Sequence, residues 1–437
     1  MTEADASPFF VCHGCGARVD MARRLPFACP NASAAQDDAD HVLVAAADGQ
    51  GLSVGREANP FLRYRQWLTP YRLARAAGLG DDAWAELVGE LDAALLAVDR
   101  RGFRLTPMTR QPALAEALGL DHDLWVKDET GNVSGSHKGR HLMGVMLYLR
   151  VLERARLPAG EGLRARRLAI ASCGNAALAA ATIARAADWP LDVFIPAHAE
   201  SQVVRRLGKL GAAISVSERR AGEAGDPCVR DFRRAVASGA IPFGVQGPDN
   251  GLAVEGARTL AFEMAEQLGA EGAAVDAMFV QVGGGALASA LAQGFAMAVA
   301  AGLHRRRPRL VAVQTAGCAP LARAWRRLAG VGLDAAAQRR SSFMWPWESV
   351  PSSLAHGILD DETYDWWEVA KAMRETDGDA VVADEDAVGR AHRLARAHTG
   401  IAVSATGAAG LAGALSAAKP EESLAVVFSG VERQAGG

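Results

Sequence analysis

Apolar residues recur with helical spacing between residues 81 and 100. They lie three or four positions apart on one face, and they are Trp84, Leu87, Leu91, Leu95 and Val98. A stripe with this period predicts one amphipathic helix over 81–100. Between 123 and 320, short apolar runs alternate with helical stretches. This alternation favours an α/β fold with a parallel sheet and right-handed crossovers.

The strands and helices of this alternating region can be located by their apolar runs. Strands are expected at 124–129, from 168 to the polar turn at 172, at 191–196, at 213–216, and from 277 to the glycines at 283. Helices are expected at 141–152, from that polar turn to about 187, at 201–210 and at about 287–301. Each strand but one is followed by a helix, as a parallel sheet requires.

A lysine lies at one of the strand-to-helix corners. Lys138 is flanked by Gly and Ser in the run 134–140, between a predicted strand and a predicted helix. A lysine in this place can point its amine into a cleft, and a partly buried amine can form a Schiff base with a carbonyl cofactor. The alternative is a surface lysine at a helix start, and this segment alone does not separate the two.

Two further corners carry anion-binding patterns. Ser172–Asn175 forms the polar turn before an Ala-rich helix, where unpaired N–H groups and the helix dipole favour a substrate carboxylate. Gly283–Gly285 follows a buried strand, and glycines let backbone N–H groups close around a phosphate. The glycine spacing is not the dinucleotide pattern with its downstream acidic residue, so NAD is discounted.

Taken together, these segments resemble the second fold type of pyridoxal-phosphate (PLP) enzymes. That family includes threonine synthase, serine and threonine dehydratases, cysteine synthase and the tryptophan synthase beta chain. The resemblance begins with Thr106-Pro107-Met108, similar to the Thr-Pro-Leu that opens this fold, and extends to about Arg433. It implies a two-lobed α/β fold with open parallel sheets and PLP as the cofactor.

The resemblance also implies a role for each matched residue. Lys138 looks like the Schiff-base lysine, Asn175 like the partner of the cofactor's phenolic oxygen, and Ser429 like the serine that faces the pyridine nitrogen. The implied phosphate cradle is Gly283, Gly284, Gly285 and Ala286. The implied substrate-binding residues are Ser172, Cys173, Gly174 and His137, the last in place of the more common Phe.

A serine at the pyridine nitrogen has a chemical consequence. A hydroxyl can donate to an unprotonated nitrogen, whereas a carboxylate would hold the nitrogen protonated, so the ring is a weaker electron sink. The resemblance therefore implies loss of the α-proton, then of a β-substituent, through an aminoacrylate-type intermediate, with the freed lysine as the base. The predicted enzyme is a PLP-dependent lyase or transferase that performs β-elimination or β-replacement on a small amino acid.

The overall pattern is most similar to the threonine synthase branch, with one departure. The run 248–263 resembles the Glu-Gly-x-x-Thr helix start of that branch, and Glu255 is its glutamate. Threonine synthases usually carry an arginine two positions earlier, which helps to bind the phosphate of O-phosphohomoserine. Here the position is Ala253, and a charge-assisted contact is lost. Three alternatives stay open: a true threonine synthase acting on O-phosphohomoserine, a cofactor-binding subunit without turnover, and a metal-dependent scaffold built on the N-terminal head.

Three cysteines near the start form an incomplete metal site. Cys12 and Cys15 make half of a zinc knuckle, and Cys29 follows. A tetrahedral site needs a fourth ligand, which His41 or an acidic residue in 37–40 could supply. The alternative is a metal-free ribbon. Threonine synthase relatives often begin with a zinc ribbon, so the resemblance implies a small zinc-ribbon-like head.

The expected domain organisation follows from these assignments. The ribbon-like head covers 1–58, a large PLP-binding domain covers 59–145 and 246–437, and a small mobile α/β domain covers 146–245. In the family that the chain resembles, the small lobe moves over the substrate and the cofactor sits at the carboxyl ends of the strands. The resemblance further implies a homodimer.

Composition argues against several other classes of protein. The formal net charge is −3 over 437 residues, so no nucleic-acid partner is expected. No apolar run reaches the roughly 18 residues that span a bilayer, so no membrane association is expected. Met1–Asp5 is acidic and has no signal-peptide core, and the predicted location is therefore the cytoplasm.

Overall fold

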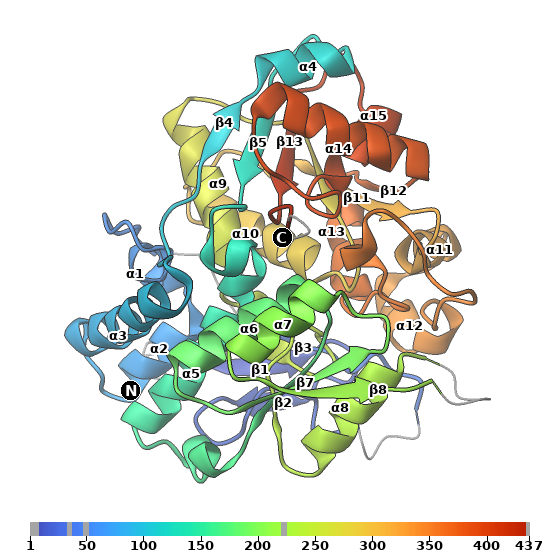
Figure 1. Ribbon diagram of the computed structural model, residues 1–437. Helices are drawn as coiled ribbons and strands as arrows, with labels where there is room; N and C mark the ends of the chain where they lie inside the picture. The colour runs from blue at the N-terminus through green and yellow to red at the C-terminus, as the bar shows by residue number, and fades with distance from the viewer. Residues whose placement is uncertain (1–7, 33–36, 47–51, 220–224, 434–437) are drawn as a thin grey trace. The chain divides into compact units, whose positions relative to one another are not determined.

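A computed structural model describes residues 8–32, 37–46, 52–219 and 225–433, and it has an α/β architecture (Figure 1). The chain divides into two compact units. The first unit consists of Met1–Leu105, Asn132–Ser134 and Lys138–Thr259, and the second of Thr106–Gly131, Gly135–His137 and Leu260–Gly437. The prediction drawn from Met1–Asp5 lies outside the described residues, and the three-part domain division stays a prediction.

The second unit is built on a six-stranded sheet in the order β12-β11-β10-β13-β5-β4. Its strands are β4 (Met108–Arg110), β5 (Leu124–Asp128), β10 (Ala277–Gln281), β11 (Arg309–Thr315), β12 (Asp379–Ala383) and β13 (Leu424–Phe428). All neighbours pair in parallel except β4, which runs antiparallel to β5. The two central strands, β10 and β13, are buried along their whole length. Such strands are continuous apolar runs, because both faces of a parallel sheet are covered.

Helices cover this sheet. The helices are α4 (Pro112–Leu118), α10 (Ala286–Ala300), α11 (Pro320–Arg327), α12 (Leu333–Ala337), α13 (Trp366–Glu375), α14 (Glu385–Thr399) and α15 (Ala409–Ala417). Helices α14 and α15 lie side by side, and α15 packs directly on the sheet (Figure 1). Glycine permits this approach, because a Cβ at Gly410 would lie 2.6 Å from the carbonyl oxygen of Phe279 and one at Gly413 would overlap Val313.

The first unit contains a four-stranded parallel sheet in the order β8-β7-β6-β9. Its strands are β6 (Leu168–Ala171), β7 (Leu191–Pro196), β8 (Ala213–Ser217) and β9 (Ile241–Pro242). The helices of this unit are α1 (Pro60–Arg63), α2 (Thr69–Ala76), α3 (Asp81–Asp99), α5 (Lys138–Arg154), α6 (Asn175–Ala186), α7 (Ser201–Lys209) and α8 (Pro227–Ala237). A further helix, α9 (Arg258–Ala270), begins in the first unit and continues in the second.

Several shorter elements accompany the two sheets. A three-stranded antiparallel sheet in the order β2-β1-β3 is formed by β1 (Phe9–Cys12), β2 (Arg18–Asp20) and β3 (Leu43–Ala45). The 3-10 turns are Arg65–Trp67, Val133–Gly135, Pro158–Gly160, Leu163–Ala165, Gly251–Val254, Arg340–Ser342 and His356–Ile358. In the part of the chain that the structure describes, no helix combines the length and the apolarity that a bilayer span requires.

The elements expected from the apolar pattern are present. The helix predicted at 81–100 is α3, which ends at Asp99 because Arg100 adopts a left-handed conformation with φ 58°. The strand predicted at 191–196 is β7, with the same bounds. The helix expected at 141–152 is longer than predicted: α5 begins at Lys138 itself. The predicted α/β class with parallel sheets is confirmed.

Candidate active site

Lys138 is the first residue of α5 and is half-buried. The chain reaches it through a left-handed turn, with φ 60° at Ser134 and 75° at Gly135. A carboxylate of the first unit holds this turn, since the N–H of Ser134 donates to Oδ2 of Asp99 at 2.7 Å. Asp99 also pairs with Arg206 at 2.7 Å. The start of α5 is therefore fixed by an ion-paired carboxylate.

The body of α5 approaches neighbouring backbone through glycines. A Cβ at Gly139 would lie 3.0 Å from the carbonyl oxygen of Val133, and one at Gly144 would lie 2.5 Å from the nitrogen of Gly256. Residues 139–149 of the helix are all buried. A helix packed this closely leaves Lys138 little freedom at its main chain, and this suits a side chain that must hold a cofactor in one orientation.

The polar turn Ser172–Asn175 lies between β6 and α6, and α6 packs on α5 within the first unit. All four of its residues are half-buried. The hydroxyl of Ser172 accepts a hydrogen bond from the N–H of Gly174 at 3.4 Å. The first-turn N–H groups of a helix this long favour an anion, so the predicted carboxylate loop has suitable chemistry.

The glycine loop of the second unit connects β10 to α10. In the described part of the chain, the backbone N–H groups of Gly283, Gly284, Gly285 and Ala286 donate to no acceptor. The carbonyl oxygens on the same loop are occupied: Gly283 accepts from Oγ1 of Thr363 and Gly284 from the N–H of Asp365, both at 2.9 Å. Because N–H and C=O point in opposite directions across a trans peptide, the open N–H groups of Gly284 and Gly285 point away from this segment.

Glycine is required along this loop on steric grounds. A Cβ at Gly283 would overlap the carboxylate of Asp360 and lie 2.9 Å from Cα of Ile358. Gly285 has φ 97°, a conformation that other residues rarely adopt. A row of open N–H groups at the start of a helix has the chemistry that suits an anion.

Ser429 follows β13, and its hydroxyl lies at the same edge of the sheet as the glycine loop. β10 and β13 pair in parallel, so their carboxyl ends adjoin. The hydroxyl accepts a hydrogen bond from Nε2 of Gln281 at 2.6 Å. The phosphate cradle and the pyridine-facing serine predicted from the sequence are therefore neighbours within the second unit.

The segment before Lys138 is attached to the segment after β13. The N–H and Nδ1 of His137 both lie 3.0 Å from the carbonyl oxygen of Ser429. The N–H of Val431 donates to the carbonyl oxygen of Gly135 at 2.9 Å. Because a carbonyl oxygen only accepts, Nδ1 of His137 carries the proton.

A second lysine near this region has a different role. Lys127, on β5, places Nζ 2.7 Å from Oε2 of Glu263, 2.8 Å from Oε1 of Gln267 and 2.7 Å from the carbonyl oxygen of Thr106. The side chains of Lys127 and Glu263 are both 0% exposed. An ammonium that donates to a buried carboxylate, an amide oxygen and a carbonyl oxygen is held in a structural network. The sequence pattern does not reveal this ion pair, because its members lie 136 residues apart.

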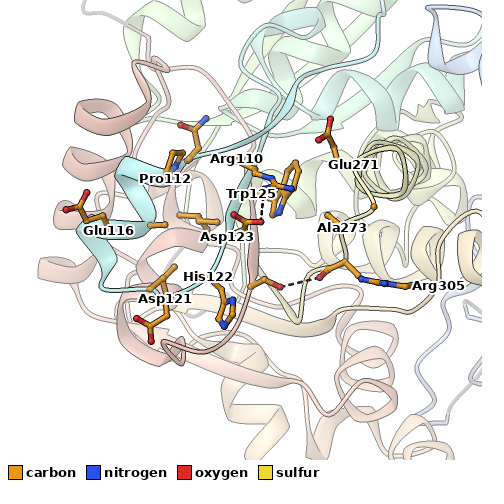
Figure 2. A pocket seen from close by; sticks show the side chains of 17 residues that line it. Arg110, Pro112, Glu116, Asp121, His122, Asp123, Trp125, Glu271, Ala273 and Arg305 are labelled. Atoms are coloured by element: carbon orange, nitrogen blue, oxygen red, sulfur yellow. Dashed lines mark hydrogen bonds and ion pairs between the residues drawn. The ribbon is translucent and has the colours of Figure 1, made fainter.

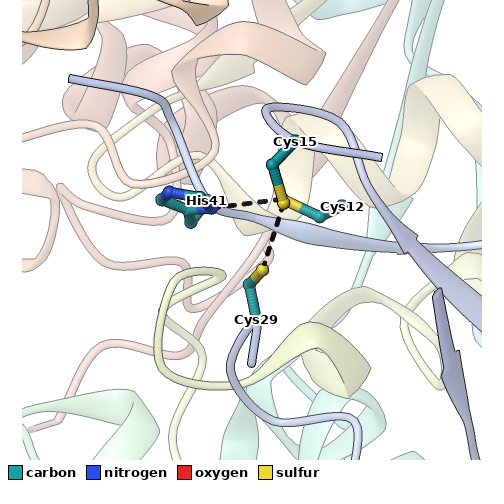
Figure 3. A group of neighbouring side chains, drawn as sticks. All are labelled: Cys12, Cys15, Cys29 and His41. Carbon is teal, nitrogen blue, oxygen red and sulfur yellow. Dashed lines mark hydrogen bonds between the residues drawn. The ribbon is translucent and has the colours of Figure 1, made fainter. Parts of the chain in front are cut away.

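The three cysteines near the start gather with a histidine (Figure 3). The ligand atoms of Cys12, Cys15, Cys29 and His41 all lie within 4.8 Å of one another. Sγ of Cys15 is 3.5 Å from Sγ of Cys29, and Sγ of Cys12 is 3.7 Å from Nδ1 of His41. A tetrahedron with metal–sulfur bonds of about 2.3 Å has edges of about 3.8 Å. Asp37 bonds the other ring nitrogen of His41 at 3.1 Å, as outer carboxylates do at metal-bound histidines.

A separate cavity of about 620 Å³ lies in the second unit (Figure 2). Its lining includes Leu124, Ala274, Arg305 and Ser423, which begin or precede β5, β10, β11 and β13. It is therefore at the amino ends of the parallel strands, and the glycine loop and Ser429 are at the carboxyl ends. Ligands of open α/β sheets bind at carboxyl ends, so this cavity is not the predicted cofactor site.

The chain matches one family of enzymes over most of its length. Residues 100–430 match the family described as "Pyridoxal-phosphate dependent enzyme". The chain belongs to this family and is a PLP-dependent enzyme, which confirms the resemblance to fold type II.

Individual relatives show where the similarity lies. The chain is 28% identical over 312 residues to a threonine synthase from Synechocystis sp., covering 71% of each protein. It is 31% identical over 217 residues to an L-serine dehydratase from Saccharomyces cerevisiae, covering 48% of this chain and 61% of the relative. The solved structure of a threonine deaminase from T.th. shares the fold, with a TM-score of 0.59 at 21% identity over 80% of this chain and 99% of that one.

Proposed function

We propose that this enzyme performs β-elimination or β-replacement on a small amino acid, with PLP bonded to Lys138. The observation that carries the proposal is the pairing of the open N–H groups of Gly283–Ala286 with the hydroxyl of Ser429 at adjoining strand ends. The N–H groups suit a phosphate, and the hydroxyl suits a ring nitrogen. When bound, PLP supplies an electron sink that stabilises negative charge at the substrate's α-carbon.

The proposal gives each predicted residue a role. Lys138 holds the cofactor and, once displaced by substrate, its amine takes the α-proton. Asn175 bonds the phenolic oxygen of the cofactor. The turn Ser172–Gly174 holds the substrate carboxylate, for which its place at the start of α6 is suited. His137 lies beside the lysine in sequence and contributes to the substrate side, with Nδ1 already committed to Ser429.

Ala253 favours substrates without a phosphate. It is buried in the turn Gly251–Val254, and its carbonyl oxygen lies 2.5 Å from Nδ1 of His141. An alanine here supplies no cation for the phosphate of O-phosphohomoserine. The second candidate, a true threonine synthase, is favoured by the relative from Synechocystis sp. and by its coverage of both chains.

Turnover of four candidate substrates tests the proposal. L-serine, L-threonine, O-acetylserine and O-phosphohomoserine are each incubated with holoenzyme, and keto acid, captured sulfide and threonine are measured. We expect keto acid or a sulfide adduct from one of the first three. Lys138→Ala should abolish product formation. Lys209→Ala, which replaces an exposed lysine on α7, should not. Threonine released from O-phosphohomoserine as the main product would establish the second candidate, and no turnover would leave a cofactor-binding subunit.

We also propose that Cys12, Cys15, Cys29 and His41 bind one zinc ion in a structural site. Support comes from the compact arrangement of their four ligand atoms and from the carboxylate of Asp37 behind His41. Three thiolates and one imidazole form a closed tetrahedral set, which is typical of structural rather than catalytic zinc. We propose that this site belongs to a zinc-ribbon-like head. We further propose a mobile small domain at 146–245, a homodimer and a cytoplasmic location for the enzyme.

A further inference from the structure

Gln281 is a buried polar residue at the end of an otherwise apolar strand. It is the last residue of β10, it is 4% exposed, and it immediately precedes Val282 and the glycine loop. A glutamine in this place costs free energy unless its amide is hydrogen-bonded. Its bonds therefore indicate why it is there.

The direction of the Gln281 amide is determined by its neighbours. Nε2 lies 2.9 Å from the carbonyl oxygen of Gly407 and 3.1 Å from that of Val427. Carbonyl oxygens only accept, so the nitrogen end of the amide must face them and the opposite orientation is excluded. The same nitrogen lies 2.6 Å from Oγ of Ser429, which is the shortest of its three contacts.

This orientation determines what the Ser429 hydroxyl can do. An amide nitrogen has no lone pair to accept with, so Oγ of Ser429 accepts from Gln281 and its own proton must point elsewhere. Ser429 is 2% exposed, and within the described residues its proton has no other acceptor. A hydroxyl that accepts one hydrogen bond becomes a stronger donor in the next. The hydroxyl is thus prepared to donate to a ligand atom that has a lone pair.

We propose that Gln281 is a positioning residue that makes the Ser429 hydroxyl a donor and so keeps the cofactor's pyridine nitrogen unprotonated. This inference rests on the proposed function, because it places the pyridine nitrogen at Ser429. A neutral nitrogen weakens the ring as an electron sink and favours departure of the β-substituent. Gln281 acts on this property through Ser429 and does not itself touch the substrate.

The test measures the protonation state of the cofactor's ring nitrogen directly. Holoenzyme is prepared with PLP labelled with ¹⁵N in the ring, and the ¹⁵N chemical shift is followed from pH 6 to pH 9. In the unmodified enzyme the shift should stay in the range of an unprotonated pyridine. In Gln281→Met, whose side chain has similar length and no N–H, the shift should move toward the protonated range as the pH falls. PLP should dissociate about five- to tenfold more readily, as expected for one lost hydrogen bond.

Two comparisons separate positioning from a purely structural role. Gln314→Met removes another buried glutamine of the same sheet, which donates to the carbonyl oxygen of Val282 and has no bond to Ser429. It should leave the ¹⁵N shift unchanged. In a Ser429→Ala background, Gln281→Met should have no further effect on the shift, because the group through which it acts is absent.

The outcomes distinguish this inference from the proposed function. A protonated nitrogen at pH 7 in the unmodified enzyme, or an unchanged shift in Gln281→Met, overturns the role of Gln281 while PLP remains on Lys138. Failure of PLP to attach to Lys138 overturns the proposed function itself. If Gln281→Met does not fold, Gln281→Leu takes its place, and the shift of the unmodified enzyme still decides whether the nitrogen is neutral.

Discussion

The carbonyl oxygen of Ser429 accepts two hydrogen bonds from His137, one from its N–H and one from Nδ1, each 3.0 Å long. His137 directly precedes Lys138 in the chain. The residue before the predicted cofactor lysine is therefore bonded to the residue predicted to face the pyridine ring. A shift of one of these two segments of the second unit would therefore displace the other.

Replacing His137 with Phe removes the hydrogen bond from Nδ1 to the carbonyl oxygen of Ser429. The backbone bond remains, so we expect the free energy of unfolding to fall by about 1 kcal/mol and PLP to remain on Lys138. Urea denaturation of the holoenzyme measures the first effect and reductive labelling the second. His122→Phe, at an exposed position, is the control. Equal stability of His137→Phe and the unmodified enzyme would show that the Nδ1 contact contributes nothing.

An alanine at Gly283 should damage the glycine loop. The new Cβ would overlap Asp360 and force the loop to move, which costs about 1–3 kcal/mol of stability in a packed region. Movement of the loop would also disorder the N–H groups proposed to hold the phosphate, so PLP affinity should fall by at least tenfold. Fluorescence titration of apoenzyme with PLP measures this.

Gly89→Ala is the control for that substitution. Gly89 is an exposed glycine in α3 with open space around its Cβ position, and alanine there should raise stability by about 0.5–1 kcal/mol. Unimpaired PLP affinity in Gly283→Ala would refute the assignment of the loop as the phosphate cradle.

The buried pair of Lys127 and Glu263 should be structural. Lys127→Met leaves the carboxylate of Glu263 buried without its cation, and we expect a loss of about 3–5 kcal/mol. The exposed pair of Arg154 and Glu86 is the comparison: its side chains are 45% and 58% exposed, and Arg154→Ala should cost less than about 1 kcal/mol. Chemical denaturation distinguishes the two. Similar costs for both substitutions would contradict a structural role for Lys127.

Zinc should copurify with the protein in a ratio of one per chain. Cys29→Ser should abolish zinc binding. Cys228→Ala, which removes a buried thiol outside the cluster, should leave the zinc in place. Elemental analysis gives the ratio. Removing the metal with a chelator should lower the free energy of unfolding by about 4 kcal/mol. The comparison is with protein in free zinc at 1,000 times the Kd of the site. A metal-free protein of unchanged stability would favour the metal-free ribbon.

Local chemistry made much of the fold predictable. The period of Trp84, Leu87 and Leu91 located α3, and the apolar run at 191–196 located β7, because burial sets the sequence period of each element. The start of α5 at Lys138 was missed by three residues, because Gly139 and the left-handed turn before it follow packing against Val133 and Asp99 rather than an apolar pattern.

The motifs of the candidate site were predictable from the sequence, but the hydrogen bonds between their residues were not. Gly283–Gly285 was recognised because it follows an apolar strand, and Ser429 because of the resemblance to the family. The role inferred for Gln281 was missed, although a polar residue that ends a buried strand is a signal that could have indicated it. The fourth member of the cysteine cluster stayed open in sequence, since His41 and Asp37 were both available; the structure directs His41 to the cysteines and Asp37 to His41.

Reduction of the holoenzyme with borohydride, followed by peptide mapping, tests the central claim most directly. Borohydride fixes a carbonyl cofactor on the lysine to which it is bonded. We predict a yellow protein that loses its colour on reduction and carries one pyridoxyl phosphate group per chain on Lys138. A colourless preparation, or a label on Lys127 or any other lysine, would contradict this prediction.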